Sequence, residues 1–219
     1  MDLTGASRIV VIGGGQAGAQ ALQSLRSGGY AGALTLVGDE PALPYQRPPL
    51  SKAYMKGEMT EERLYFRPAP WYQDQDIEVI LSTPVKNIDR THRKVELAHG
   101  GHLDYDALII ATGSRPRALP LKGATLHGVH DLRDLSDVER IRPNMIEGRK
   151  MVIIGAGYIG LEAAAVARQM GLDVTVLEMA PRVLARVTSP VMSDFFETEH
   201  RAQGVTILTD SRLDHLDGT

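Results

Sequence analysis

The stretch VVIGGGQAGAQAL at residues 10–22 has a counterpart of the same kind in VIIGAGYIGLEAA at residues 152–164. In each stretch a short apolar run precedes a G-x-G-x-x-G pattern, and an alanine-rich run follows it. A short apolar run bounded by glycine predicts a buried strand, and the alanine-rich run predicts a helix. Each stretch therefore predicts a strand, a tight glycine turn and a helix, which together begin a βαβ unit with a parallel sheet.

The glycines of the two patterns have separate physical roles. The first allows the bend, the second lets a pyrophosphate approach the backbone, and the third lets the helix pack against the strand. Free amides and the positive end of the helix dipole favour the bound diphosphate. One such pattern is weak support, because glycine turns also arise from packing alone, but two predict a pair of dinucleotide sites. They are Gly13, Gly15 and Gly18 in the first turn and Gly155, Gly157 and Gly160 in the second.

The rest of the sequence continues this α/β pattern. HGG at residues 99–101 predicts a hairpin turn, and Ser189 followed by Pro190 predicts the N-cap and first residue of a late helix. Apolar runs between turn residues predict the other elements. The predicted strands cover residues 8–12, 33–37, 77–81, 85–88, 94–97, 105–111, 151–154, 174–177 and 205–208, and the predicted helices cover residues 16–27, 49–56, 158–170 and 190–203.

A carboxylate follows the second strand of each unit. Asp39 and Glu40 follow the first such strand, and Glu178 follows the second. An acid at this point accepts hydrogen bonds from ribose hydroxyls and repels a 2′-phosphate, so Glu178 favours NADH over NADPH. Arg182 and Arg186 lie shortly after Glu178, and an arginine is what a 2′-phosphate would need. The preference for NADH is therefore open to that alternative.

Composition limits the chemistry and the partners. The 219 residues carry a net charge of −3 with no block of one sign, so we expect neither a nucleic-acid nor a membrane partner. The seven histidines show no metal-site spacing, and we expect no metal. The first residues, MDLTGASRIVV, lack the features of a signal peptide, so a cytoplasmic location is expected. There is no cysteine, so a thiol pair of this protein cannot take up electrons from a bound dinucleotide.

Three stretches together resemble a known family. They are VGDEPALPYQRPPLSKAYMKG at residues 37–57, ALIIATGSRPRALP at residues 107–120, and residues 152–187 around the second glycine turn. The chain closely resembles, over essentially its whole length, the FAD-dependent ferredoxin and rubredoxin reductases that serve oxygenase and cytochrome P450 systems. These belong to the pyridine nucleotide-disulphide oxidoreductase superfamily. The resemblance implies a glutathione-reductase-like fold of two Rossmann-like units with parallel sheets.

The resemblance also implies cofactor-binding residues. The first turn with Ala17 would hold the FAD pyrophosphate, Asp39 or Glu40 its ribose, and Val85 its adenine. Further FAD contacts would come from Arg47, Lys52, Ala111, Thr112, Gly113 and Arg133. The NADH site would consist of Gly155, Gly157, Tyr158, Ile159, Gly160 and Glu178.

The activity that the resemblance implies is hydride transfer from NADH to FAD, followed by single-electron transfer to an iron–sulfur ferredoxin or a rubredoxin. Lys52 would stabilise negative charge on the flavin, and Glu162 would orient both the lysine and the nicotinamide amide. An NADH oxidase, or a nucleotide-binding or redox-sensing module without catalysis, is the alternative on the same scaffold.

Plain structural interpretations compete with these roles. Lys52 and Glu162 could be solvated helix residues, and Arg133 could pair with Asp134 or Asp137. Tyr158 and Trp71 could serve packing alone.

The predicted organisation is an FAD-binding domain at residues 1–117 and an NADH-binding domain at residues 118–219. Both would be the N-terminal parts of their domains, because a complete unit needs further strands after Leu208. Relatives continue with a C-terminal interface domain, so we expect this chain to be a truncated form.

Overall fold

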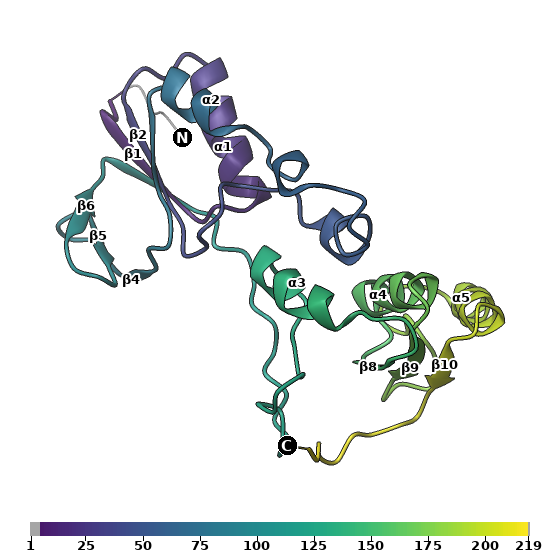
Figure 1. The fold of residues 1–219 in the computed structure, drawn as a ribbon. Coiled ribbons are helices and arrows are strands. Elements are labelled where there is room, and N and C mark those ends of the chain that lie inside the picture. Colours follow the sequence, from purple (N-terminus) through teal and green to yellow (C-terminus); the bar gives the residue numbers. More distant parts are fainter. Residues whose placement is uncertain (1–4, 219) are drawn as a thin grey trace. The chain divides into compact units, whose positions relative to one another are not determined.

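The computed structural model describes residues 5–218 and divides into two compact units (Figure 1). The first unit comprises the chain up to residue 46 together with residues 61–115, and the second comprises residues 47–60 together with the chain from residue 116. The segment 47–60 thus packs with the second unit, although the predicted range 1–117 had placed it with the first. The assignment of the units to FAD and NADH stays a prediction.

The first unit is built on a four-stranded parallel sheet with strand order β3-β2-β1-β7. Its central strand β1 lies between β2 and β7, and helix α1 follows it directly. The parallel order agrees with the predicted βαβ start. The elements are β1 Arg8–Ile12, α1 Gln16–Ser27, β2 Ala33–Val37, α2 Ala69–Asp74, β3 Ile77–Ile80 and β7 Ala107–Ile110.

Both faces of this sheet are covered, as is usual for parallel strands. Ile9 and Val11 pack on one face with Leu22 of α1, and Val10 and Ile12 pack on the other. Successive residues of a strand point to opposite faces, so one short apolar run supplies both cores. The second face packs against an antiparallel sheet of β4 Val85–Asp89, β5 Lys94–Leu97 and β6 His102–Asp104.

The second unit contains a three-stranded parallel sheet with order β10-β9-β8. Helix α4 follows β8 in the same way that α1 follows β1. Val174 and Val176 of β9 and Ile207 of β10 are fully buried, together with Ala164 and Ala167 of α4. The elements are α3 Leu135–Ile141, β8 Lys150–Ile154, α4 Tyr158–Gln169, β9 Asp173–Leu177, α5 Pro190–Ala202 and β10 Thr206–Leu208.

Several local features differ from the prediction, among them strand β6 at His102–Asp104, which was not predicted. The expected helix at 49–56 is a single 3-10 turn at Pro48–Ser51 followed by further turns, because the preceding prolines leave few backbone donors for a longer helix. Helices α2 and α3 were not predicted. Ser189 occupies the N-cap of α5, but its side chain makes no capping bond.

Helix α3 begins at a capping box. Asp134 accepts from the Asp137 N–H at 3.0 Å, and Asp137 Oδ2 accepts from the Asp134 N–H at 3.0 Å. The same Oδ2 accepts from the Arg133 backbone N–H at 2.7 Å, and Asp137 Oδ1 pairs with Arg140. Asp137 therefore contacts Arg133 at the Arg133 main-chain N–H, in keeping with the plain structural pairing considered for these residues.

Candidate dinucleotide-binding sites

The first glycine turn requires glycine at two of its three pattern positions. Gly13 has φ +108°, and a Cβ built there would lie 2.4 Å from the carbonyl oxygen of Ala111. A Cβ on Gly18 would lie 2.0 Å from the carbonyl oxygen of Gly13. The Gly13 N–H donates to the Val37 carbonyl at 2.8 Å and so ties the turn to the end of β2. The turn and the start of α1 are thus in the tight geometry that the pattern predicts.

The N-terminus of α1 has the properties of an anion site. Gly15 is its N-cap, and a Cβ there would meet nothing within 4 Å, so a diphosphate can approach the backbone closely. The cap has no side-chain hydrogen bond, and no acid lies in the first turn of the helix. Ala17, in that turn, is exposed. These features suit a bound diphosphate.

The two acids after β2 are in different situations. The Glu40 carboxylate accepts a hydrogen bond from the Tyr45 hydroxyl at 2.5 Å. The Asp39 side chain is 57% exposed, and it forms a 4.0 Å ion pair with Arg115, whose side chain is 89% exposed. Asp39 is therefore the acid of this pair with more room to accept ribose hydroxyls.

Other predicted FAD residues of the first unit follow its strands. Val85 begins β4 and is partly buried. The Ala111 N–H donates to the Ile12 carbonyl at 2.7 Å, which continues the β1–β7 pairing past the end of β7. Thr112 is exposed, and Gly113 takes φ +68°. The stretch 111–113 thus runs beside the first glycine turn, as the contact between Ala111 and Gly13 shows.

The second glycine turn repeats the backbone of the first. Gly155 has φ +102°, and its N–H donates to the Leu177 carbonyl at 2.7 Å. A Cβ on Gly160 would lie 2.1 Å from the Gly155 oxygen, whereas one on Gly157, the N-cap of α4, would meet nothing. Like α1, helix α4 has no side-chain cap and no acid in its first turn. This turn therefore fits a second diphosphate.

Three further residues of the predicted NADH site lie around this turn. Tyr158 and Ile159, in the first turn of α4, are 51% and 50% exposed. Both are too exposed to be core residues in this unit, which argues against the pure packing role considered for Tyr158. Glu178 Oε2 accepts from the Ala156 N–H at 2.7 Å, and Oε1 accepts from the Ala180 N–H at 2.8 Å. The turn itself thus positions this carboxylate.

The segment 47–60 brings Lys52 to Glu162 within the second unit. Lys52 Nζ lies 2.5 Å from Glu162 Oε2, and it also donates to the Pro48 carbonyl at 3.2 Å. The Ser51 hydroxyl donates to the same Glu162 oxygen at 2.5 Å. Ser51 is 5% exposed, whereas the Lys52 side chain is 48% exposed. Lys52 and Glu162 are therefore paired with each other, unlike the separately solvated residues of the plain interpretation.

Arg47 and Arg133 also meet in the second unit. Arg47 Nη1 donates to the Arg133 carbonyl at 3.1 Å, although the residues lie far apart in the sequence. The predicted site residues accordingly form two sets, one in each unit. The first unit holds Gly13, Gly15, Ala17, Gly18, Asp39, Glu40, Val85, Ala111, Thr112 and Gly113, and the second holds Arg47, Lys52, Arg133, Gly155, Gly157, Tyr158, Ile159, Gly160, Glu162 and Glu178.

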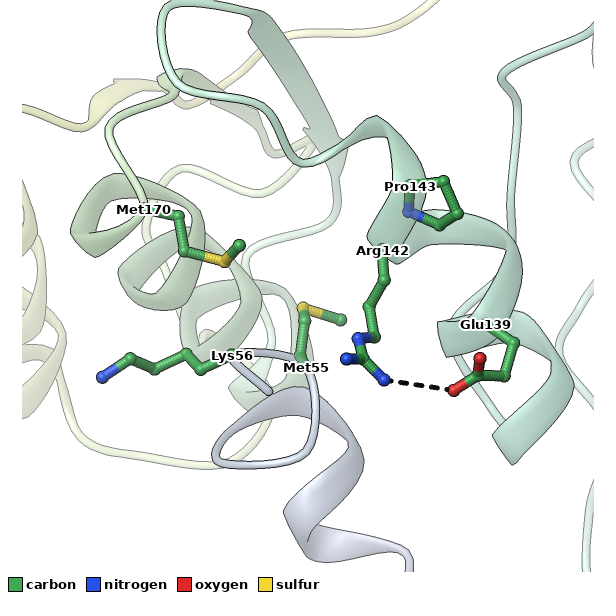
Figure 2. A pocket seen from close by; sticks show the side chains of 6 residues that line it. All are labelled: Met55, Lys56, Glu139, Arg142, Pro143 and Met170. Carbon is green, nitrogen blue, oxygen red and sulfur yellow. Dashed lines mark hydrogen bonds and ion pairs between the residues drawn. The ribbon is translucent and has the colours of Figure 1, made fainter. Parts of the chain in front are cut away.

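A cavity of about 400 Å³ in the second unit contains none of these predicted residues (Figure 2). Its charged groups already have partners. Glu139 accepts from the Tyr54 hydroxyl at 2.6 Å and from Arg142 at 3.3 Å, and Lys56 pairs with Glu58 at 2.5 Å. The cavity therefore offers no free charged group for chemistry. It is lined by Met55, Lys56, Glu139, Arg142, Pro143 and Met170.

Sequence reasoning missed two hydroxyl groups of the site, those of Ser51 and Tyr45. Ser51 is in the stretch that carries the resemblance and precedes Lys52, so its position was a usable signal. The bond between Tyr45 and Glu40 had no signal in the pattern. In residues 5–218, no helix combines the length and the apolar character needed to cross a bilayer.

Comparisons with known proteins bear on the family and the fold. The family model described as pyridine nucleotide-disulphide oxidoreductase matches residues 7–219. The chain belongs to this family. Rhodocoxin reductase of Rhodococcus erythropolis is 51% identical to it over 197 residues, which are 90% of this chain and 46% of that protein. Putidaredoxin reductase of Pseudomonas putida is 43% identical over 94% of this chain and 49% of that protein.

The solved structure of a covalent putidaredoxin reductase–putidaredoxin complex matches with a TM-score of 0.94 and 42% identity, over 97% of this chain and 52% of that chain. The predicted resemblance and fold class are therefore confirmed. The chain spans about half the length of the curated relatives it matches.

Proposed function

We propose that this chain is part of a flavoprotein reductase that takes a hydride from NADH onto FAD and passes single electrons to a ferredoxin or rubredoxin. The observation that carries the proposal is the contact of Ser51 and Lys52, in the segment 47–60, with Glu162 on the helix that follows the second glycine turn. A lysine paired with a carboxylate beside a nicotinamide site suits hydride transfer, because it can stabilise charge that develops on the acceptor.

FAD supplies the conversion of a two-electron hydride into single electrons. The protein supplies position and charge. In the first unit, Gly15 and the uncapped start of α1 offer backbone amides to a diphosphate, and Asp39 offers a carboxylate to a ribose. These residues would hold the cofactor, with Arg47, Arg133 and Lys52 as further contacts carried over from the resemblance.

Glu162 has one oxygen occupied and one available. Both Lys52 and Ser51 contact Oε2, and Oε1 has no partner among residues 5–218. Oε1 can therefore accept a hydrogen bond from the carboxamide of a nicotinamide while Lys52 keeps its ammonium close to the acceptor. This arrangement orients both reactants with two side chains.

The proposed electron acceptor follows from the relatives and from the composition. Rhodocoxin reductase and putidaredoxin reductase are named for the electron carriers they reduce. The absence of cysteine leaves this chain without a thiol pair that could take electrons from a flavin. An external one-electron carrier is therefore the acceptor we propose. Because NADH is an intracellular cofactor, we also propose a cytoplasmic location.

Replacement of Lys52 tests the proposed hydride transfer. In the product of the intact gene, Lys52→Met is expected to slow flavin reduction by NADH on the order of a hundredfold, with little change in NADH affinity. Stopped-flow absorbance near about 450 nm follows the flavin. Lys56→Met is the matched control, because Lys56 lies in the same segment but pairs with Glu58 instead of Glu162. An unchanged rate in Lys52→Met would refute the proposed role.

Mixing the reduced protein with candidate acceptors tests the second half of the reaction. A ferredoxin or rubredoxin should be reduced faster than molecular oxygen is consumed. Rapid oxygen consumption without carrier reduction would indicate the oxidase alternative, and a preparation without flavin absorbance would indicate a module without catalysis.

A further inference from the structure

The loop between β9 and α5 covers one side of the second glycine turn. Leu184 N–H donates to the Ala156 carbonyl at 2.9 Å, and the Ala156 N–H donates to Glu178 at 2.7 Å. Ala156 is fully buried between the two bonds. The glycine turn, the Glu178 carboxylate and the loop at Leu184 are therefore held together by one residue of the turn.

Leu184 is in an unfavourable backbone conformation at this contact. It has φ +53°, although a bulky residue with a left-handed backbone is an outlier that persists only when its surroundings impose it. Its side chain is 3% exposed, and its carbonyl accepts from the N–H groups of Val187 and Thr188. The loop therefore has a fixed conformation that needs a strong local restraint.

Arg182 provides that restraint. Its Nη1 donates to the Thr188 carbonyl at 3.0 Å and to the Ser193 hydroxyl at 2.6 Å, and its Nη2 donates to the Ala185 carbonyl at 2.9 Å. Ser193 is fully buried and donates in turn to the Val183 carbonyl at 2.6 Å. The guanidinium thus links the backbone of the loop at residues 185 and 188 and joins the loop to α5. Its planar, fixed arrangement of N–H donors suits several acceptors at once.

We propose that Arg182 is a positioning residue of the NADH site, which fixes the loop that supports Ala156 and Glu178, and that it does not bind a 2′-phosphate. This inference rests on the proposed function. It also gives different roles to Arg182 and Arg186, the two arginines that follow Glu178. Arg186, in the same loop, is exposed and has no hydrogen bond or ion pair among residues 5–218. Arg186 is therefore the basic side chain of the loop that a 2′-phosphate could attract.

The two roles of an arginine predict different nucleotide selectivity. A residue that reads the 2′-phosphate affects NADPH and leaves NADH unchanged. A residue that positions Glu178 and the glycine turn affects both nucleotides by the same factor, because both share the adenosine and the diphosphate. The ratio of the two affinities therefore separates the roles, and a general loss of folding would lower kcat together with affinity.

The experiment compares Arg182→Met with Arg186→Met in the product of the intact gene. Nucleotide affinity is measured by titration of the FAD-free protein, and KM and kcat are measured with the FAD-loaded enzyme. In Arg182→Met, the affinities for NADH and NADPH should each fall on the order of tenfold with an unchanged ratio, while kcat at saturating NADH stays within about twofold. In Arg186→Met, the affinity for NADH should stay unchanged.

Two further variants distinguish the proposed role of Arg182 from a general loss of folding. Ser193→Ala removes one of the three acceptors and should show the same pattern with a smaller loss, and Arg182→Lys should restore part of the affinity. Loss of NADPH binding alone in Arg182→Met would overturn the inference, and so would unchanged binding of NADH. If the unaltered protein binds neither nucleotide, the proposed function fails and the inference fails with it.

Discussion

The two glycine turns share a backbone but differ in what surrounds them. In both, the first glycine has a strongly positive φ, +108° at Gly13 and +102° at Gly155. In both, a Cβ on the third glycine would collide with the carbonyl oxygen of the first, at 2.0 Å and 2.1 Å. The turns belong to different sheets, however, and their neighbours are not equivalent.

The first difference is the strand beside the turn. In the first unit, β7 pairs with β1, and its continuation brings the Ala111 carbonyl against Gly13. In the second unit, β8 lies at an edge of the sheet formed by the described residues, and a Cβ on Gly155 would meet nothing within 4 Å. At Gly13, both the positive φ and the lack of room for a Cβ therefore require glycine. At Gly155, only the positive φ does.

The second difference is the position of the acid. The strand registers pair Ile12 with Val37 and Ile154 with Leu177, so Gly38 of the first unit corresponds to Glu178 of the second. A Cβ on Gly38 would lie 3.5 Å from the Gly14 nitrogen. At the equivalent position of the second unit, the Ala156 N–H donates to the Glu178 carboxylate. One motif thus supports two kinds of site. The second turn holds its acid directly, whereas the first unit offers its acid one residue later.

Alanine substitutions of the first glycines should separate the turns most strongly. Gly13→Ala combines backbone strain with a collision and should reduce the free energy of unfolding by roughly 3–5 kcal/mol. Gly155→Ala has only the strain and should lose roughly 1–3 kcal/mol. Urea unfolding measures both. Trp71, the single tryptophan, lies in α2 of the first unit, so its fluorescence should report the loss in Gly13→Ala. Equal losses would contradict this account.

Neutral replacements of Glu178 and Asp39 should each weaken the binding of a different cofactor. Glu178→Gln should weaken NADH binding by about 1.5–3 kcal/mol, because a charged acceptor is lost, and should leave FAD content unchanged. Asp39→Asn should do the reverse. Nucleotide titration and the flavin-to-protein absorbance ratio measure the two effects. Glu40→Gln is the control, since the Glu40 carboxylate is bonded to Tyr45. A larger FAD loss in Glu40→Gln than in Asp39→Asn would reverse the assignment.

Removal of the Ser51 hydroxyl should have a smaller effect within the second unit. Ser51→Ala should lower the free energy of unfolding by about 1 kcal/mol and slow flavin reduction less than Lys52→Met does, because Lys52 still contacts Glu162. Chemical denaturation and stopped-flow reduction test the two parts. Ser51→Thr, which keeps a hydroxyl, should behave like the unaltered protein. No change in either measurement for Ser51→Ala would show that the bond has no role.

Alkaline pH should weaken the first unit before the second. Burial is the main cause that raises the pKa of Tyr72 to about 12, and burial followed by the hydrogen bond to Glu61 raises the pKa of Tyr65 to about 12. Both pKa values lie above the ordinary value of 10.0, so the neutral forms favour the folded state. Their contribution is present below pH 10 and is lost as the pH rises towards 12. Tyrosinate absorbance should show two late-titrating groups, and Tyr72→Phe should remove one of them.

Acidic pH should destabilise the second unit, and this should be the smallest of the expected effects. Burial lowers the pKa of His200 below its ordinary value of 6.5, so the neutral imidazole favours the folded state. Its contribution is present above pH 6.5 and is lost as the pH falls through the folded-state pKa. Thermal unfolding between pH 7 and pH 5 should show less pH dependence in His200→Gln than in the unaltered protein. An identical slope in both proteins would exclude His200 as the source.

Much of the fold was readable from local signals. The strands and helices beside both glycine turns were predicted to within a few residues, because apolar runs and glycines mark them without reference to distant contacts. Helices α2 and α3 were missed, since each spans about two turns or fewer, over which a helical period is hard to recognise. The cap of α3 depends on Asp134 and Asp137, which the sequence also allowed as partners of an arginine side chain.

The sequence by itself determined the two glycine turns, the acid that follows each unit's second strand, and the lack of cysteine. These are properties of single residues and short runs, because the tolerance of glycine for a positive φ, its missing Cβ and a missing sulfur do not depend on the rest of the fold. Only the tertiary structure decided that the segment 47–60 packs with the second unit, that Ser51 and Lys52 share one oxygen of Glu162, and that Arg182 is held by backbone carbonyls. Ser51 and Glu162 are 111 residues apart, and packing between such distant segments follows from the whole arrangement of layers, which no local pattern encodes.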